Sequence, residues 1–339
     1  MYNFIIAVLL TIAPVSAGPA QASEEVNVYS HRHYDTDRML FEKFTEKTGI
    51  AVNVVKASAD QLIKRLEIEG EQSPADILIT VDAGRLHRAQ VKGLLQPVKS
   101  PKLRAQIPAH LRDPLGHWYG LTKRARIIVY SKDRVKPDQL STYEALTEPQ
   151  WKSKVLIRSS QNIYNQSLMA SMIVAHGSKG AAKWAKGMVA NFARTPKGND
   201  RDQVKAIASG IGDVAVVNTY YIGKMLTSED EAERHAGSHV GIFFPNQAQR
   251  GAHVNVSGAG VTKSAKNLTN AVALLEFLSS QEAQQALAEA NSEYPVNQNV
   301  QTPPLVKSWG EFKTDRINLS LLGKNNFEAV KIFAESGWR

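Results

Sequence analysis

The alternation of strand-like and helix-like segments is the feature that most constrains how this chain folds. Short apolar runs of strand length are followed by amphipathic stretches that end at glycine, such as the run at 76–81 and the stretch at 83–92 before Gly93. This alternation is typical of α/β proteins, in which helices cover the faces of a sheet. We therefore expect an α/β architecture with mainly parallel strands.

The apolar runs and the helix stop signals predict where the individual elements lie. We expect strands at residues 26–30, 50–55, 76–81, 124–131, 155–158, 213–217 and 254–261. We expect helices from residue 36 to a stop at Gly49, after a capping box of Ser58 and Gln61, at 83–92, from 165 to a stop at Gly177, and at 200–209, 267–278 and 281–290. The strand at 124–131 and the glycine-containing run at 254–261 are interpreted as two crossings between lobes.

The first 22 residues have the pattern of an export signal. An apolar run at residues 4–15 is followed by small residues at 18–22, which is typical of a cleavable signal peptide. The alternative is an uncleaved membrane anchor, but the run is well short of the roughly 20 residues that a spanning helix needs. We therefore expect the mature protein to begin near Ser23 and to be secreted.

Size and composition limit what the mature chain can do. Removal of the leader leaves about 315 residues, which is enough for two domains of ordinary size. The chain has no cysteine, so a metal site would use oxygen and nitrogen ligands. The formal net charge is +9, but the lysines and arginines are scattered without a long basic run, which argues against nucleic-acid binding. Attraction to anionic surfaces or to a negatively charged ligand complex fits better.

Four of the ten tyrosines follow the carboxyl ends of predicted strands, where α/β proteins present side chains to a cleft: Tyr34, Tyr164, Tyr220 and Tyr221. A phenol binds metal after losing its proton, which costs about 4 kcal/mol at pH 7 for an ordinary pKa of about 10. A highly charged cation offsets that cost, whereas magnesium and calcium are served by carboxylates and carbonyls. This pattern favours a hard trivalent ion such as ferric iron.

A second interpretation of the same pattern involves no metal. A tyrosine at a strand–helix junction is often half-buried with its hydroxyl in a hydrogen bond, and spacing alone leaves both interpretations open. The six histidines His87, His117, His176, His235, His239 and His253 show no metal-ligand spacing. The sequence also contains no GxSxG elbow, phosphate loop or nucleotide fingerprint, so we do not expect an enzyme.

Five motifs resemble those of the periplasmic ferric-binding proteins, the bacterial relatives of transferrin lobes, and in particular their cyanobacterial-type iron uptake branch. They are YSHRHYDTD (29–37), DILITVDAGRLHRA (76–89), RSSQNIYNQSL (158–168), NTYY (218–221) and EYPV (293–296). The resemblance extends over essentially the whole mature chain. It implies a type II periplasmic solute-binding fold, in which two α/β lobes joined by a hinge close on Fe(III) in the cleft between them.

The resemblance also implies the residues of the site. It assigns the metal to Tyr34, Tyr164, Tyr220 and Tyr221, and makes His33 a further candidate ligand, because some relatives use this histidine and others do not. Arg124 is expected to pair with a carbonate-like anion or to offset the charge of the phenolates. Lys224, four residues after Tyr220 on one helical face, is expected to reach a phenolate.

The expected function follows from these assignments. The protein would bind ferric iron in the periplasm as a monomer and deliver it to an ABC-type inner-membrane permease. We expect an N-terminal lobe of residues 23–122 and 246–297 and a C-terminal lobe of 123–245 and 298–339. The alternatives are a different ligand in the same fold, such as an anion or a polyamine, and an iron-dependent oxidoreductase. The sequence leaves open whether Fe(II) is also carried and whether an external anion completes the site.

Overall fold

The computed structural model describes residues 24–32 and 34–339. The expected signal peptide and the candidate ligand His33 lie outside the described residues. The strands of the described part are β1 (Glu25–Ser30), β2 (Ala51–Lys56), β3 (Ile77–Val81), β4 (Tyr119–Ser131), β5 (Val155–Leu156), β6 (Val214–Asn218), β7 (Val240–Phe243), β8 (Val254–Val261) and β9 (Tyr294–Pro295).

Helices follow most of these strands, as expected from the alternation. They are α1 (Asp35–Thr48), α2 (Ala59–Glu69), α3 (Ala83–Val91), α4 (Pro101–Gln106), α5 (Ile163–Asn191), α6 (Asp200–Ala208), α7 (Thr219–Leu226), α8 (Glu231–Ser238), α9 (Leu268–Leu278), α10 (Gln281–Asn291), α11 (Pro304–Lys307), α12 (Ser320–Lys324) and α13 (Asn326–Ser336). The predicted capping box before α2 is confirmed, because Ser58 and Gln61 bond each other's backbone N–H groups. The predicted stop of α1 at Gly49 is also confirmed, with φ at 76°.

The strands form a mixed sheet in the order β2-β1-β3-β8-β4-β6-β5, with β7 and β9 also paired to β4. Parallel pairing is found between β1 and β2, β1 and β3, and β5 and β6. The pairings of β3 with β8 and of β4 with β6, β7, β8 and β9 are antiparallel. The expectation of mainly parallel strands is therefore wrong, because β4 and β8 cross the molecule in opposite directions and impose antiparallel pairing on their neighbours.

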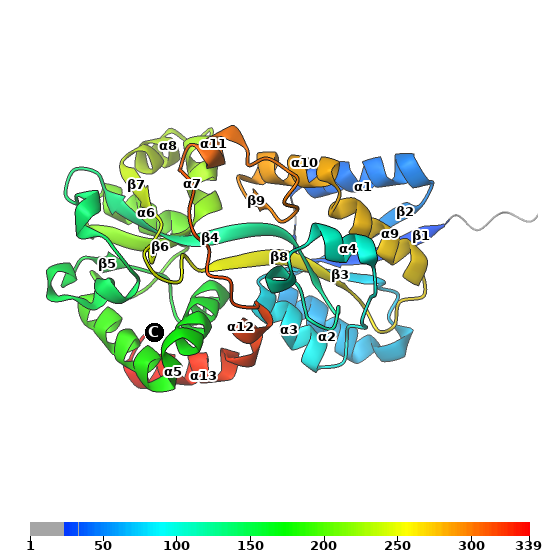
Figure 1. Ribbon diagram of the computed structural model, residues 1–339, viewed down its shortest axis with the longest axis horizontal. Helices are drawn as coiled ribbons and strands as arrows, with labels where there is room; N and C mark the ends of the chain where they lie inside the picture. The colour runs from blue at the N-terminus through cyan, green and yellow to red at the C-terminus, as the bar shows by residue number, and fades with distance from the viewer. Residues whose placement is uncertain (1–23, 33) are drawn as a thin grey trace, which may run out of the picture.

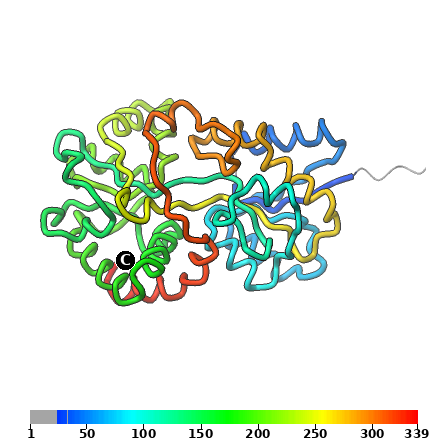
Figure 2. Tube along the Cα trace, in the orientation of Figure 1, coloured from blue at the N-terminus to red at the C-terminus, as the bar shows by residue number. Residues whose placement is uncertain are grey.

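Two lobes share the long strand β4, as Figures 1 and 2 show. Residues Tyr119 to Ala125 pair with β8, and Arg126 to Tyr130 pair with β6. One lobe contains β1 to β3 with α1 to α4, α9 and α10, and the other contains β5 to β7 with α5 to α8 and α13 (Figure 1). The exact lobe boundaries stay a prediction. The crossings predicted at 124–131 and 254–261 coincide with β4 and β8.

The helix predicted to end at Gly177 has a kink there instead. Gly177 adopts φ 66° and ψ 169°, and the chain then continues as helix to Asn191. The second half of α5 buries Trp184 and Met188, and α5 packs against α13 near the C-terminus. The glycine correctly indicated that the helix axis changes at residue 177. The helix continues beyond it because its second half is packed against α13, about 150 residues away in sequence, which no local pattern indicates.

The lobes also contact each other outside the sheet. The buried carboxylate of Asp82, on the turn before α3, accepts a 2.6 Å hydrogen bond from the hydroxyl of Ser167 on α5. The short helix α12 contacts both α3 and α5. In the described part of the chain, no helix is long and apolar enough to cross a bilayer.

Candidate metal centre

The four candidate tyrosines all stand where a helix follows a strand. Tyr34 is the N-cap residue of α1, just after β1, and Tyr164 lies in the first turn of α5. Tyr220 and Tyr221 lie in the first turn of α7, directly after β6. The side chain of Asn162 accepts a 3.0 Å hydrogen bond from the Tyr164 N–H and so caps α5. Tyr34 therefore comes from one lobe and the other three from the second lobe.

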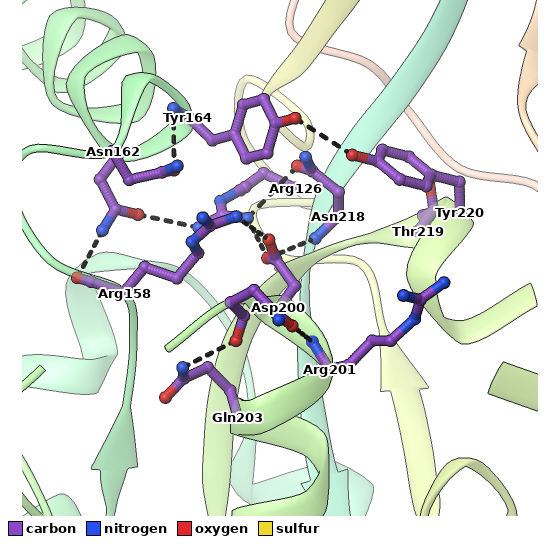
Figure 3. Close-up of polar contacts among 12 residues, drawn as sticks. Arg126, Arg158, Asn162, Tyr164, Asp200, Arg201, Gln203, Asn218, Thr219 and Tyr220 are labelled. Carbon is purple, nitrogen blue, oxygen red and sulfur yellow. Dashed lines mark hydrogen bonds and ion pairs between the residues drawn. The ribbon is translucent and has the colours of Figure 1, made fainter. Parts of the chain in front are cut away.

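These tyrosines lie near one another where the two lobes meet. The hydroxyls of Tyr164 and Tyr220 are 3.2 Å apart and point toward each other (Figure 3). The rings of Tyr220 and Tyr221 are stacked at an angle, with centroids 4.3 Å apart. Tyr34 lies close enough that charge on Tyr164 affects its pKa. The hydroxyls of Tyr164 and Tyr220 meet within the second lobe, and a metal site that closes between lobes would add an oxygen from the first.

Burial favours the protonated forms of Tyr34, Tyr220 and Tyr221. Tyr220 is 6% exposed, and burial raises its pKa well above the ordinary 10.0, as do the nearby phenol groups of Tyr164, Tyr221 and Tyr34. Burial is also the main reason that the pKa values of Tyr34 and Tyr221 are raised. Neighbouring phenolates repel one another, so this cluster loses its protons together only when a strong positive charge is present among them.

Three guanidinium groups surround the ring of Tyr164. The Cζ atoms of Arg124, Arg126 and Arg158 lie 5.7, 5.9 and 5.5 Å from the ring centroid. Arg124 and Arg126 alternate with their neighbours along β4, so both face the tyrosines. A positive field of this kind favours any negative charge that forms in the cleft.

Asp200 holds two of these arginines in place. Its buried carboxylate is 2.6 Å from Nη1 of Arg126 and 2.9 Å from Nη1 of Arg158 (Figure 3). The same carboxylate accepts a hydrogen bond from the N–H of Asn218, two residues before Tyr220. Arg126 also donates to Asn165, the neighbour of Tyr164. This network fixes the strand ends from which the tyrosines of the second lobe project.

Arg124 has unused hydrogen-bond donors beside the tyrosines. It is 2% exposed, and within residues 24–32 and 34–339 its Nε and Nη2 atoms have no hydrogen-bond partner. Its Nη1 atom lies 3.4 Å from the hydroxyl of Ser257. Buried guanidinium donors usually have partners, so this side chain is suited to an anionic group that enters the cleft.

Lys224 crosses the cleft toward the other lobe. Its Nζ atom is 3.8 Å from the ring centroid of Tyr34 and 5.9 Å from that of Tyr220. Burial lowers the pKa of Lys224, and the carboxylate of Glu293 acts in the opposite direction. The Cζ atom of Arg32 is 5.0 Å from the ring centroid of Tyr34, and this guanidinium is paired with Asp37. Two cations thus lie close to the one tyrosine that the first lobe supplies.

Sequence reasoning missed the network of Arg126, Arg158 and Asp200. The position of Arg126 two residues after Arg124 on one strand was a usable signal, because side chains two apart share a face. Asp200 gave no comparable signal, since its partners lie 74 and 42 residues away. In the described residues, no group of three or more histidines, aspartates and glutamates is placed to hold a metal ion.

Comparisons with known proteins agree with this architecture. The model of the bacterial extracellular solute-binding protein family matches residues 72–314. The chain is 51% identical to "Iron uptake protein A1" of Synechocystis over 96% of its length and 91% of that protein. It is 25% identical to the "Major ferric iron-binding protein" of Neisseria meningitidis serogroup B over 98% of each chain. These relatives are iron-binding proteins of iron uptake.

Solved structures show the same fold. A Trichodesmium protein in complex with iron and citrate superimposes with a TM-score of 0.91 at 50% identity, and the match covers 93% of this chain and 100% of that protein. A ferric binding protein of Campylobacter jejuni gives a TM-score of 0.87 at 45% identity, with coverage of 93% and 100%. The expected type II solute-binding fold and the resemblance to ferric-binding proteins are confirmed by these similarities.

Proposed function

This chain belongs to the bacterial extracellular solute-binding proteins, and we propose that it captures one ferric ion with the phenolates of Tyr34, Tyr164, Tyr220 and Tyr221. The observation that carries the proposal is the meeting of tyrosine hydroxyls in the cleft, with those of Tyr164 and Tyr220 3.2 Å apart. The protein would act in the periplasm and hand the ion to an ABC-type permease. The names of its relatives, which describe iron uptake and ferric-iron binding, support this role.

The protonation of the site favours ferric over divalent cargo. Deprotonating one phenol of ordinary pKa at pH 7 costs about 4 kcal/mol, and burial makes the cost larger here. Four phenols together need a cation whose attraction exceeds this sum. Fe(III) attracts the phenolates more strongly than Fe(II) does, so reduction of the iron would release it. Acid would also release it, because the phenolates would be protonated.

Charge balance explains the basic residues around the tyrosines. Four phenolates and Fe(III) carry a net charge of minus one, and Arg124 near Tyr164 and Lys224 near Tyr34 would offset it. The free donors of Arg124 would also hold a carbonate-like or carboxylate anion beside the metal. The complex of the Trichodesmium relative with both iron and citrate supports a role for an anion alongside the metal.

Binding would be coupled to closure of the lobes. Tyr34 stands on one lobe and its three partners on the other, so the set is complete only when the lobes meet. The approach is close where α7 faces α10. A Cβ atom built on Gly223 would lie 2.3 Å from the Cβ of Ser292, which is far inside normal contact distance. Glycine at this position lets the two helices approach.

We therefore expect Gly223→Ala to hold the cleft partly open. The added methyl group cannot fit beside Ser292, so the two lobes could not approach fully. Tyr34 would then lie too far from the metal, and ferric affinity should fall at least tenfold. Small-angle scattering should show a larger radius of gyration with iron than for the wild type.

The double variant Gly223→Ala/Ser292→Gly provides the control. Ser292 has φ 54°, a conformation that glycine adopts readily, and its removal clears the space for the new methyl group. Affinity should return most of the way to the wild-type value. Equal affinity of Gly223→Ala and wild type would contradict closure at this contact.

Proton release is a second expected result. The phenols are protonated without metal and deprotonated with it, so acid favours the metal-free protein and affinity must fall as pH falls. Between pH 6 and 8, the logarithm of the ferric affinity should rise with a slope of roughly three to four per pH unit, because that number of phenols loses a proton. Competition with a chelator of known pH dependence measures the slope. A slope of one or less would rule out the phenolate set.

Titration of iron-free protein with a ferric chelate tests the proposed function itself. Phenolate bound to ferric iron absorbs visible light, so colour should grow linearly and stop at one equivalent of iron. A complex with an anion or a polyamine alone would stay colourless. Protein that remains colourless and binds no iron in an excess of ferric citrate would end the proposal.

A further inference from the structure

A second cavity lies on the side of β4 away from the tyrosines. Its volume is about 470 Å³, and its walls include Lys123 of β4, Tyr294 of β9, His110, Thr314 and Arg316. An adjoining cavity of about 460 Å³ shares Lys123 and Tyr294 with it. Because side chains alternate along a strand, Lys123 faces away from the cleft into which Arg124 points. The cavity is therefore separate from the candidate metal centre.

Lys123 brings a positive charge without a counter-charge. Its side chain is partly buried, and within the described residues no charged group offsets the effect of burial on its pKa. Its Nζ atom lies 5.7 Å from the ring centroid of Tyr294, the residue opposite it in the β4–β9 pairing. Burial lowers the pKa of Lys123. A partly buried ammonium of this kind is costly for the protein unless a negative group comes close.

Tyr294 lines the same cavity and has a buried hydroxyl without a hydrogen-bond partner in the described residues. The residue is 6% exposed, and among residues 24–32 and 34–339 its hydroxyl has no hydrogen-bond partner. Its ring is held against Phe312, with centroids 5.3 Å apart. Burial raises the pKa of Tyr294, so the hydroxyl remains a donor at neutral pH. Buried hydroxyls without partners are rare, and this one is available to an acceptor.

Two further basic residues line the cavity among mostly neutral neighbours. Arg316 and Lys313 stand at its edge, and the Lys313 ammonium donates to the carbonyl of Gln249. The pKa of His110 is lowered first by burial and then by the charges of Arg316 and Lys123. No aspartate or glutamate lines this cavity, and Glu311 lines the adjoining one. The wall thus offers donors and positive charge but little to balance them.

We propose that this cavity is a binding site for a small multivalent oxyanion, the size of a di- or tricarboxylate or a phosphate, held by Lys123 and Tyr294. A carboxylate or phosphate oxygen accepts hydrogen bonds from both an ammonium and a hydroxyl, and it neutralises the charge that the cavity lacks. A cation or a neutral sugar would leave the ammonium of Lys123 uncompensated. The site does not depend on the iron-binding function.

The bound anion would join two parts of the chain near the hinge. Lys123 and Tyr294 belong to β4 and β9, whereas Thr314 and Arg316 belong to the segment between α11 and α12, which runs across β4 and β8 in Figure 1. Thr314 pairs with Ala252, just before β8. An anion at this place would fasten the crossing segment to the strand that both lobes share.

Calorimetry and thermal unfolding of iron-free protein test the proposal, with citrate and inorganic phosphate as two separate probes and glycerol as a neutral probe. Lys123→Met should lose this site, with affinity for the anion falling at least tenfold. The same variant should unfold at a higher temperature than the wild type in anion-free buffer, because an unbalanced charge is gone. Tyr294→Phe should weaken anion binding while keeping the ring packing.

Arg124→Met separates this site from the metal cleft. It removes the donors that would hold an anion beside the tyrosines, but it leaves Lys123 in place. Citrate or phosphate should therefore still raise the unfolding temperature of this variant, as it should for the wild type. Binding of both probes would mean that any multivalent oxyanion is accepted, and binding of citrate alone would mean that carboxylates are selected. Wild-type anion binding by both Lys123→Met and Tyr294→Phe, or loss of all anion binding in Arg124→Met, would overturn the proposal.

Discussion

Tyr220→Phe is expected to weaken ferric binding by roughly a thousandfold or more, which corresponds to about 4 kcal/mol. The substitution keeps the buried ring and removes one charged oxygen ligand, so the site loses metal attraction without a cavity in the core. Tyr221→Phe and Tyr164→Phe should have effects of similar size, and each should reduce or shift the visible absorption band. Chelator competition with the purified variants measures the loss.

A matched substitution distant from the cleft shows whether the effect is specific. Tyr119 is 1% exposed, and its hydroxyl donates a 2.7 Å hydrogen bond to the carbonyl of Val98 in the first lobe. Tyr119→Phe should cost about 1 kcal/mol of stability and leave ferric affinity unchanged. If the Tyr220→Phe variant bound iron as tightly as Tyr119→Phe, Tyr220 would not be a ligand.

Asp200→Asn is expected to lower the free energy of unfolding by about 3–5 kcal/mol. The side chain is fully buried, and its carboxylate lies 2.6 Å from Arg126 and 2.9 Å from Arg158. An amide keeps the shape but leaves two guanidinium groups without a negative partner. Urea unfolding followed by circular dichroism measures the loss.

A partly exposed carboxylate whose arginine partner reaches solvent serves as the control. Asp213 lies 2.7 Å from Nε of Arg134, whose side chain is 37% exposed. Asp213→Asn should cost about 1 kcal/mol or less, because solvent screens the pair. A loss below 1 kcal/mol in Asp200→Asn would mean that the buried arginines tolerate the missing charge and that the network is not a structural requirement.

The positions of the four tyrosines could be predicted because a local rule places them. Residues that follow the carboxyl end of a strand in an α/β unit face a cleft, and Tyr34, Tyr164 and Tyr220 all have this position in the structure. The same rule says nothing about which tyrosines meet. That depends on the crossing strands, whose antiparallel pairing the alternation of elements does not reveal.

The sequence did not reveal the contacts of Lys224 and Asp200, because their partners are distant in the chain. Lys224 was expected near Tyr220 because both lie on one helical face, but its ammonium lies closer to the ring of Tyr34, 190 residues earlier. Asp200 is likewise surrounded by residues from other elements, and its role depends on burial that no local pattern predicts. Local spacing thus predicts which strand ends carry the tyrosines, whereas the charges around them follow from packing.

A crystal structure of iron-loaded protein, with anomalous diffraction measured at the iron absorption edge, tests the central claim most directly. We expect a single strong anomalous peak in the cleft, with the hydroxyl oxygens of Tyr34, Tyr164, Tyr220 and Tyr221 all at bonding distance from it. An iron peak bound elsewhere, or one in the cleft with these hydroxyls directed away from it, would contradict tyrosine capture of ferric iron.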